Sequence, residues 1–422
     1  MRYTLYNIVM YTGQLLLHAL CDVDVRTLRE RKLFKFALGQ CHAIESLQKE
    51  FSKRGDDEVI WLHAASYGEY AIARPIIRHL HYTGRTIVLT VFSPSAYEAL
   101  KDCYKQEGID YFFYLPLDTS RNSKVFLDII RPSKAIFIVS EYWINYLREL
   151  NRRNIQTFFV SSLIHGDSYL LKWYGRPILK AIPVETKFMV LDDISKQCLR
   201  RAGFHNVTIM GDPLFDNALN IAQTPYTNEI IERFCASAEN GLFIAGSISD
   251  LQDLKIVSTF ANTHRDIKCV FVPHEISEEI LNEIKYQLDG WAEIYSDCTP
   301  ETDFSKRQVL IIDFMGVLSK IYRYGNWAYV GGGFTPYLHS VIEPVVYGLP
   351  VAFGPRIGRK VTPRQMTSIG IGKIVKSAKE LSLWIDQLPL DSEEMIRIGQ
   401  TARTYAKSNS GATKKVVQCI TE

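Results

Sequence analysis

Short apolar segments rich in β-branched residues alternate with helix-like segments along most of this chain of 422 residues. The alternation runs once between residues 58 and 159, through VIWLHAA, TIVLTVF, DYFFYLPL, AIFIVS and TFFVSS. It starts again after a break, through GLFIAGS, CVFVPH, QVLIID, WAYVGG and LPVAFG. Strands that alternate with helices at this spacing indicate βαβ units and a parallel sheet. The sequence therefore predicts an α/β protein with two successive doubly wound, Rossmann-like domains.

The length agrees with this division, because about 150 residues per domain gives two to three domains. We predict an N-terminal helix and basic segment at 1–35, a first Rossmann-like domain at 36–210 and a second at 211–422. Residues 392–406 have a helical pattern, and we expect this last segment to be able to fold back on the first domain.

Net charge and cysteine spacing exclude several classes of protein. The 49 Lys and Arg residues nearly balance the 46 Asp and Glu residues, for a formal charge of +3, so no nucleic-acid partner is predicted. The eight cysteines never approach metal-binding or CxxC spacing, and we interpret them as dispersed, reduced thiols of a cytosolic protein. No HExxH, HxxxH or paired-Asp motif appears, so neither a metal nor a cofactor is predicted.

The N-terminus is apolar enough to suggest contact with a membrane. Residues 3–21 contain no charged side chain, but Asn7, Thr12 and Gln14 make the run marginal for a spanning helix. No signal-peptide cleavage site follows, and several Arg and Lys residues lie between 26 and 35. An apolar helix followed by cations suits an anchor on the lipid of the inner membrane. The alternative is a helix packed on the domain surface. Whether an anchoring helix would span the membrane or lie on one side of it stays open.

Two carboxylates follow predicted strands of the first domain. Ligands of open parallel sheets bind beyond the carboxyl ends of the strands, so two such sheets are expected to offer a cleft lined by these loops. Glu69, in HAASYGE, is either a general base whose pKa is raised by burial or an acid that complements a helix dipole. Glu141, in VSEYW, is either a second catalytic carboxylate or an exposed helix cap.

Loops of the second domain carry candidate residues for binding a nucleotide sugar. Gly331, Gly332 and Gly333 follow the strand WAYV and allow close backbone approach to a ligand. Ser340 and Glu343 lie where the next helix is expected to begin, which places them to meet phosphate and ribose hydroxyls. Glu343 is equally explained as an acid of the first helical turn.

Two further segments end on the same edge of the second predicted sheet. Ser247, in GSISD, offers a hydroxyl to an anion, although an ordinary helix cap explains it almost as well. Pro273 and His274, in VPHE, end the next strand, and a lone His is more often structural than a ligand.

Taken in order, these segments resemble a known family. They are similar to the 3-deoxy-D-manno-octulosonic acid (Kdo) transferases of Gram-negative bacteria over nearly the whole chain. The matching segments are IWLHAASYGE, SEYW, KWYGRP, GDPLFD, AGS, VPHE, DFMGVL, YVGGGF, HSVIEP and YGLPVAFGP. The KWYGRP stretch is similar to members from Bacteroidetes.

The resemblance implies a GT-B glycosyltransferase whose second domain holds most of the nucleotide sugar. It implies transfer of Kdo from CMP-Kdo to a lipid A precursor, lipid IVA, at the cytoplasmic face of the inner membrane during lipopolysaccharide biosynthesis. It assigns Glu69 to the family's proposed general base and Glu141 to its E-x-W acid. It also assigns Ser247 to the phosphate loop and Glu343 to the nucleotide ribose. The expected reaction is a single inverting displacement.

Several positions depart from the family pattern, mainly on the donor side. Leu214 stands where relatives carry Arg or Lys, and Ile144, Ile248 and Ser340 replace other motif residues. If a cation that faces phosphate is missing at 214, Arg356 or Lys360 is a candidate replacement.

The departures leave three interpretations open: an active Kdo transferase, a GT-B enzyme that uses another sugar nucleotide, or a membrane-bound paralogue without activity. The second includes epimerases and transferases that act on UDP-sugars.

Overall fold

The computed structural model describes residues 2–21, 32–51, 57–139, 141–289 and 292–422, which form two compact units. Unit 1 comprises Met1–Asn217 and Gly411–Glu422, and unit 2 comprises Ala218–Ser410. The basic segment predicted at 26–35 lies largely outside the described residues, because 22–31 are not among them.

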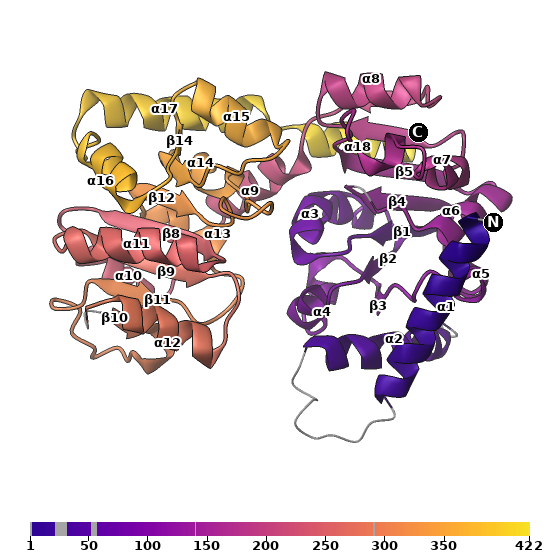
Figure 1. Cartoon of the computed structure of the whole chain (residues 1–422), viewed down its shortest axis with the longest axis horizontal. Helices are drawn as coiled ribbons and strands as arrows, with labels where there is room; N and C mark the ends of the chain where they lie inside the picture. The colour runs from indigo at the N-terminus through magenta and orange to yellow at the C-terminus, as the bar shows by residue number, and fades with distance from the viewer. Residues whose placement is uncertain (1, 22–31, 52–56, 140, 290–291) are drawn as a thin grey trace. The chain divides into compact units, whose positions relative to one another are not determined.

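Unit 1 is built on a seven-stranded parallel sheet in the order β3-β2-β1-β4-β5-β6-β7 (Figure 1). The strands are β1 Val59–His63, β2 Thr86–Val91, β3 Tyr111–Tyr114, β4 Lys134–Ile138, β5 Gln156–Ser162, β6 Lys187–Val190 and β7 Val207–Ile209. The strand order reverses between β1 and β4, and such a reversal is where ligands bind in open sheets. The helices are α1 Arg2–Cys21, α2 Lys32–Phe51, α3 Tyr67–His81, α4 Pro94–Leu100, α5 Ser120–Ile130, α6 Ile144–Arg152, α7 Arg176–Ala181, α8 Asp193–Arg201 and α18 Ala412–Thr421. Helix α9, Pro213–Gln223, begins in unit 1 and ends in unit 2.

Side chains of this sheet point alternately to two faces, and each face has its own apolar core. Val59 and Trp61 of β1 pack with residues of α2, α5 and α6 on one face. Ile60 and Leu62 pack with α3, α4 and α18 on the other. Both faces are covered, which explains why the central strands are continuous apolar runs rather than alternating ones.

Unit 2 repeats this architecture with the strand order β10-β11-β9-β8-β12-β13-β14, again wholly parallel. Its strands are β8 Leu242–Ile248, β9 Lys268–Pro273, β10 Ala292–Ile294, β11 Val309–Ile311, β12 Trp327–Val330, β13 Val351–Phe353 and β14 Gly372–Ile374. The order reverses between β8 and β12. The helices are α10 Glu229–Ala236, α11 Leu251–Thr263, α12 Glu278–Gln287, α13 Leu318–Ile321, α14 Ile342–Val346, α15 Val361–Ser368, α16 Ala378–Asp386 and α17 Glu393–Ser408. The two doubly wound parallel sheets confirm the predicted fold class.

The chain returns to unit 1 through its last helix. Residues 393–408 form α17 within unit 2, whereas Val416 and Ile420 of α18 are buried in the core of unit 1. Asp216, from GDPLFD, caps α18: its carboxylate accepts hydrogen bonds from the amides of Gly411 (2.5 Å) and Thr413 (2.7 Å). The acid of this motif therefore holds the C-terminal helix in place.

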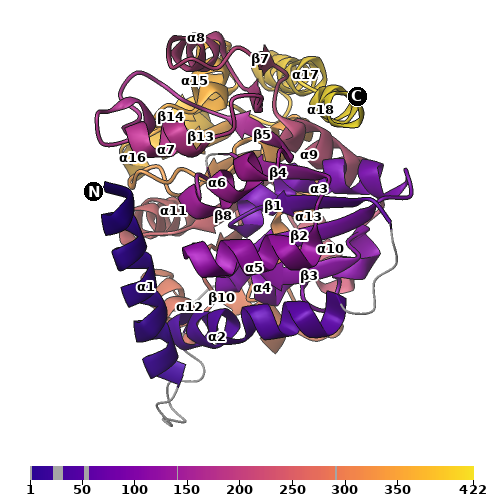
Figure 2. The same cartoon turned by 90° about the vertical axis from the view of Figure 1, so that its right-hand side faces the viewer.

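The N-terminal helix α1 lies beside α2, as Figure 2 shows, and tyrosine hydroxyls attach it to unit 1. Tyr6 donates to the buried Asp118 (2.5 Å), and Tyr3 donates to Asn145 (2.5 Å). Asp118 also accepts the amides of Asn145 and Tyr146 at the start of α6, and burial raises its pKa to about 7. These polar contacts turn the tyrosines inward.

The other side of α1 presents apolar side chains to the exterior. Leu5, Val9 and Leu16 are 62%, 57% and 62% exposed. None of the helices in the described ranges is long and apolar enough to cross a membrane. One face of α1 is bound to unit 1, and another exposes apolar side chains.

Candidate active site

Glu69 lies where the sheet of unit 1 reverses its order, because the turn after β1 leads directly into α3. Ser66 caps this helix, and its hydroxyl accepts the amide of Glu69 (3.3 Å). In return, Oε2 of Glu69 accepts the amides of Ala65 (2.5 Å) and Ser66 (3.3 Å), which completes a capping box. Glu69 thus has the structural role of a first-turn acid.

The environment of the carboxyl also suits proton transfer. Burial, followed by the charge of Glu141, raises the pKa of Glu69 to about 8, although the amides of Ala65 and Ser66 oppose the shift. Among the residues that the structure describes, none donates a hydrogen bond to Oε1. A half-buried carboxyl with this pKa and one oxygen outside the cap can exchange a proton near neutral pH.

A buried histidine connects the loops that follow β1 and β4. His63, the last residue of β1, has Nδ1 2.9 Å from the hydroxyl of Thr90 and 3.1 Å from its carbonyl oxygen. Trp143 donates its indole N–H to Nε2 (3.2 Å), which leaves Nδ1 as the ring nitrogen that can donate to Thr90. Glu141 Oε2 lies 3.9 Å from the same Nε2. The sequence reasoning missed His63, whose only signal is its place at the end of the strand before SxGE.

In unit 2 the candidate loops follow β8 and β12, again where the strand order reverses. One buried carboxylate, Asp253 of α11, joins them. Its Oδ2 accepts the amide of Gly332 (2.7 Å) as well as the amide (3.3 Å) and hydroxyl (3.2 Å) of Ser249. Its Oδ1 accepts the hydroxyl of Tyr329 (2.7 Å). Asp253 was also missed, because an acid at this position looks like an ordinary first-turn residue.

The three glycines after β12 are required by close packing of the protein itself. A Cβ at Gly331 would lie 2.2 Å from the carbonyl oxygen of Ser247, and one at Gly333 would lie 2.4 Å from the amide of Gly354. Gly332 has φ +85°, a conformation that favours glycine, and its amide is bound to Asp253. The amide of Gly331 also donates to the carbonyl of Gly246 (3.0 Å). The expected use of this loop as a phosphate cradle therefore has two amides fewer than the sequence suggested.

Basic side chains gather beside the glycine loop. The rings of His274 and His339 lie 4.1 Å apart, and the amide of His339 donates to Gly331 (3.1 Å). Lys360 donates through Nζ to the carbonyl of Leu338. Burial, with the nearby His274 and Lys360, lowers the pKa of His339 to about 4, so this ring is neutral near pH 7.

The other residues that were predicted to bind the nucleotide sugar lie at different places in unit 2. Ser247 sits at a bulge of β8 with φ +53°, and Pro273 pairs with Ile248 across that bulge. Ser340 precedes α14, a helix of only five residues, and its hydroxyl accepts the amide of Ile342 (3.4 Å). Burial raises the pKa of Glu343 to about 7.

Leu214 belongs to unit 1, where its partly buried side chain packs against the apolar core that includes residues of α18.

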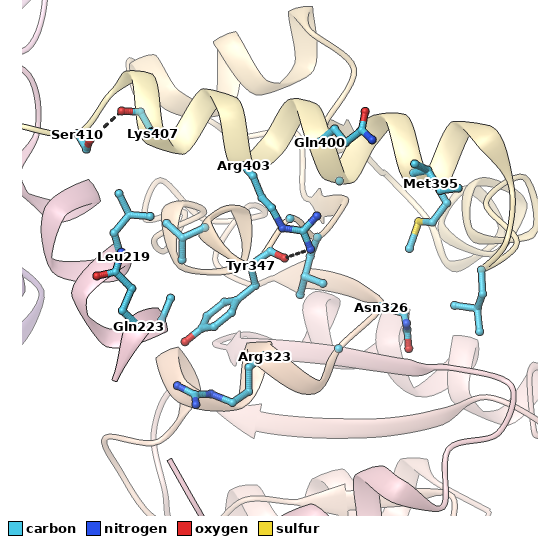
Figure 3. Close-up of a pocket in the computed structure, with 18 residues that line it drawn as sticks. Leu219, Gln223, Arg323, Asn326, Tyr347, Met395, Gln400, Arg403, Lys407 and Ser410 are labelled. Atoms are coloured by element: carbon cyan, nitrogen blue, oxygen red, sulfur yellow. Dashed lines mark hydrogen bonds between the residues drawn. The ribbon is translucent and has the colours of Figure 1, made fainter. Parts of the chain in front are cut away.

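A separate pocket of about 1040 Å³ lies at the opposite ends of the unit 2 strands (Figure 3). Asn326 and Leu349, which line it, precede β12 and β13. Arg403 donates to the carbonyl of Tyr347 (3.0 Å), and Arg323 donates to the carbonyl of Thr224 (2.8 Å). Both guanidinium groups therefore bind backbone carbonyls of the protein itself. The pocket is distinct from the candidate loops that follow β8 and β12. In the described part of the chain, no three His, Cys, Asp or Glu side chains gather as metal ligands would.

Comparisons of the sequence place these residues in a family context. Residues 38–217 match the family model for 3-deoxy-D-manno-octulosonic-acid transferase (kdotransferase). A 3-deoxy-D-manno-octulosonic acid transferase of Chlamydophila psittaci is 25% identical over 75% of this chain and 74% of its own length. A bifunctional glycosyltransferase/methyltransferase of Fusobacterium nucleatum is 26% identical over 73% of this chain. The aligned part spans about half of that protein (49%).

Solved structures show the fold. The UDP-GlcNAc 2-epimerase of Neisseria meningitidis bound to UDP-GlcNAc superposes with a TM-score of 0.58 and 12% identity, covering 86% of this chain and 99% of that one. The glycosyltransferase SnogD of Streptomyces nogalater superposes with a TM-score of 0.53 and 12% identity, covering 87% and 99%. At this identity the likeness concerns architecture, and it agrees with the predicted GT-B fold.

Proposed function

We propose that this chain, whose residues 38–217 match the Kdo transferase family model and which is similar to Kdo transferases over most of its length, transfers Kdo from CMP-Kdo to a lipid A precursor, lipid IVA, in lipopolysaccharide biosynthesis. The observation that carries the proposal is Glu69. It occupies the family's SxGE position, lies where the sheet reverses its order, and has a pKa raised to about 8.

In the proposed reaction, Glu69 accepts the proton of an acceptor hydroxyl through Oε1 while the hydroxyl oxygen attacks the anomeric carbon of Kdo. The bond from that carbon to the CMP phosphate breaks, the phosphate keeps the electron pair, and the configuration inverts. Glu141 contributes through its charge, which raises the pKa of Glu69 and makes it a stronger base.

The nucleotide is assigned to unit 2. Ser247 and Lys360 provide a hydroxyl and a cation for phosphate, and Glu343 provides acceptors for the ribose hydroxyls. The amide of Gly332 is already bound to Asp253, so the side chains carry more of the phosphate contact than the glycine motif suggests.

We place the protein on inner-membrane lipid, attached peripherally through α1. Its tyrosines bind unit 1, and its exposed leucines and valine are available to the headgroup region.

The direct test is incubation of the purified protein with labelled CMP-Kdo and lipid IVA, followed by chromatography of the lipid product. Labelled UDP-sugars with the same acceptor form the control. Lipid labelled from CMP-Kdo alone supports the proposal. Label from a UDP-sugar favours another donor, and CMP binding without any transfer favours a paralogue that lacks activity.

We expect Asp253→Asn to weaken CMP binding by about 10-fold. In this variant an NH₂ group, which can only donate, replaces one of the two carboxylate oxygens that now accept hydrogen bonds from Gly332, Ser249 and Tyr329. A buried polar group that is left unsatisfied costs about 1–3 kcal/mol. Isothermal titration with CMP measures the effect. Asp250→Asn, which keeps a good helix cap on the same α11, is the matched control and should bind as wild type does.

We also expect Lys360→Met to weaken CMP binding by about 10-fold or more, because it removes a charge-assisted contact worth roughly 1.5–3 kcal/mol. Leu214→Arg should leave the affinity flat or lower it, since Leu214 belongs to an apolar core. Lys379→Met, on the exposed side of α16, controls for net charge. A 10-fold gain in Leu214→Arg, with no loss in Lys360→Met, would instead show that the cation is missing at 214.

A further inference from the structure

Two cysteines that are 20 residues apart in the sequence meet where α1 crosses α2. The Sγ atoms of Cys21 and Cys41 lie 2.7 Å apart, and both side chains are half-buried. A disulfide bond is 2.03–2.05 Å long, so an approach of about 0.7 Å separates this contact from a covalent link. We propose that Cys21 and Cys41 form a reversible disulfide site that ties the N-terminal helix to the body of unit 1.

The Cys41 side of the pair is held firmly. The neighbouring Gln40 donates to the carbonyl of Leu115 (3.0 Å) and accepts the amide of Leu117 (2.8 Å). Gly39 allows α2 to lie against Tyr114, because a Cβ there would come within 2.4 Å of the ring. These contacts fix this turn of α2 on the loop that follows β3.

The Cys21 side is held by the rest of α1. Tyr3, Tyr6 and Tyr11 bind Asn145, Asp118 and Ser120 through their hydroxyls. One turn before Cys21, the carbonyl of Leu17 also contacts Cys41 Sγ (3.7 Å). The tyrosines anchor the first half of the helix, and the thiol pair meets at its last turn.

This arrangement favours a bond within the protein over a lasting bond to a small thiol. Two groups that the fold already holds in contact react as if at high concentration, so a mixed disulfide on one cysteine is resolved by the other. All eight cysteines lie in the described part of the chain, and the structure shows no second pair in such contact.

The oxidant that we name is a small disulfide such as oxidised glutathione. One cysteine thiolate attacks a sulfur of the oxidant, forms a mixed disulfide and releases one glutathione. The other cysteine then attacks the protein sulfur of the mixed disulfide, forms the Cys21–Cys41 bond and releases the second glutathione. The two cysteines lose two protons and two electrons, and the electrons reduce the oxidant.

The bond would make the attachment of α1 covalent. This helix carries the exposed apolar residues that are proposed above to contact the membrane. Oxidation would therefore fix the helix that carries them to unit 1. The site itself does not depend on the proposed transferase reaction.

The test uses the full-length protein, equilibrated with oxidised glutathione and then alkylated under denaturing conditions. We expect two of the eight thiols to escape alkylation, with a mass lower by about 2 Da before alkylation. Tryptic digestion without reductant should give peptides 3–26 and 36–49 joined to each other, and dithiothreitol should separate them.

Cys21→Ser and Cys41→Ser should each abolish the joined peptides, whereas Cys103→Ser, a half-buried thiol outside this pair, should retain them. A glutathione adduct on the remaining partner cysteine in the single variants would support the pathway. The proposal is overturned if the wild-type protein keeps eight alkylatable thiols, accumulates stable glutathione adducts at Cys21 or Cys41, or joins a different pair.

Discussion

Glu69→Gln should lower the rate of Kdo transfer by about 10²–10⁴, the usual effect of losing a positioned general base. Gln keeps an amide oxygen that can accept the N–H groups of Ala65 and Ser66, so the capping box survives while proton abstraction does not. Transfer measured with labelled CMP-Kdo, together with the melting temperature, separates the two roles.

The pH profile gives a second readout of the same prediction. A base must be deprotonated, and the pKa of Glu69 is about 8, so turnover of the wild-type enzyme should rise with pH up to and beyond this value. In Glu69→Gln this acidic limb should disappear.

Ser66→Ala is the matched control, because it removes the side-chain cap of α3 but leaves the carboxylate. It should lower the stability by about 1 kcal/mol and retain most of the activity. If Glu69→Gln keeps more than half of the wild-type turnover, Glu69 is not the base.

Replacing Leu5, Val9 and Leu16 together by Gln should release most of the protein from membranes. Each side chain is more than half exposed, and burial of one such group contributes roughly 1.5–3 kcal/mol, so the partition constant should fall by about 10³-fold or more. Sedimentation with vesicles that contain anionic phospholipid measures the loss. Deleting residues 1–21 is a poorer test, because it would remove the partners of Asp118 and Asn145.

The control for this variant replaces three exposed apolar residues of unit 2 in the same way, namely Leu251, Leu383 and Ile396. These substitutions should leave sedimentation unchanged. If the α1 variant still sediments quantitatively with vesicles, the helix is not the attachment site.

The class of fold followed from the sequence because long apolar runs and helical periodicity are local signals. The central strands of both sheets lie in the segments that the alternation predicted. The short strands β6, β7, β10 and β14 were not predicted, since three or four residues at the edge of a sheet, or next to it as in β6, carry too little pattern. The membrane attachment, the domain limits and the roles of the site residues stay predictions.

The candidate site shows where local reasoning ends. The sequence alone indicated that Glu69 begins a helix after a strand, but its pKa depends on burial and on Glu141, which is 72 residues further along the chain. It suggested that the three glycines approach a ligand, whereas Ser247 and Gly354 turn out to be what they approach.

Asp253 and the pair Cys21 and Cys41 carry no sequence signal at all. Each gains its meaning from atoms that folding brings within about 3 Å: the amide of Gly332 for Asp253, and one sulfur for the other in the cysteine pair. Propensity and periodicity act over a few neighbouring residues and therefore determined the elements and their order. Hydrogen bonds, charge coupling and thiol contact act through space, so only the tertiary packing decided which side chains can share a reaction.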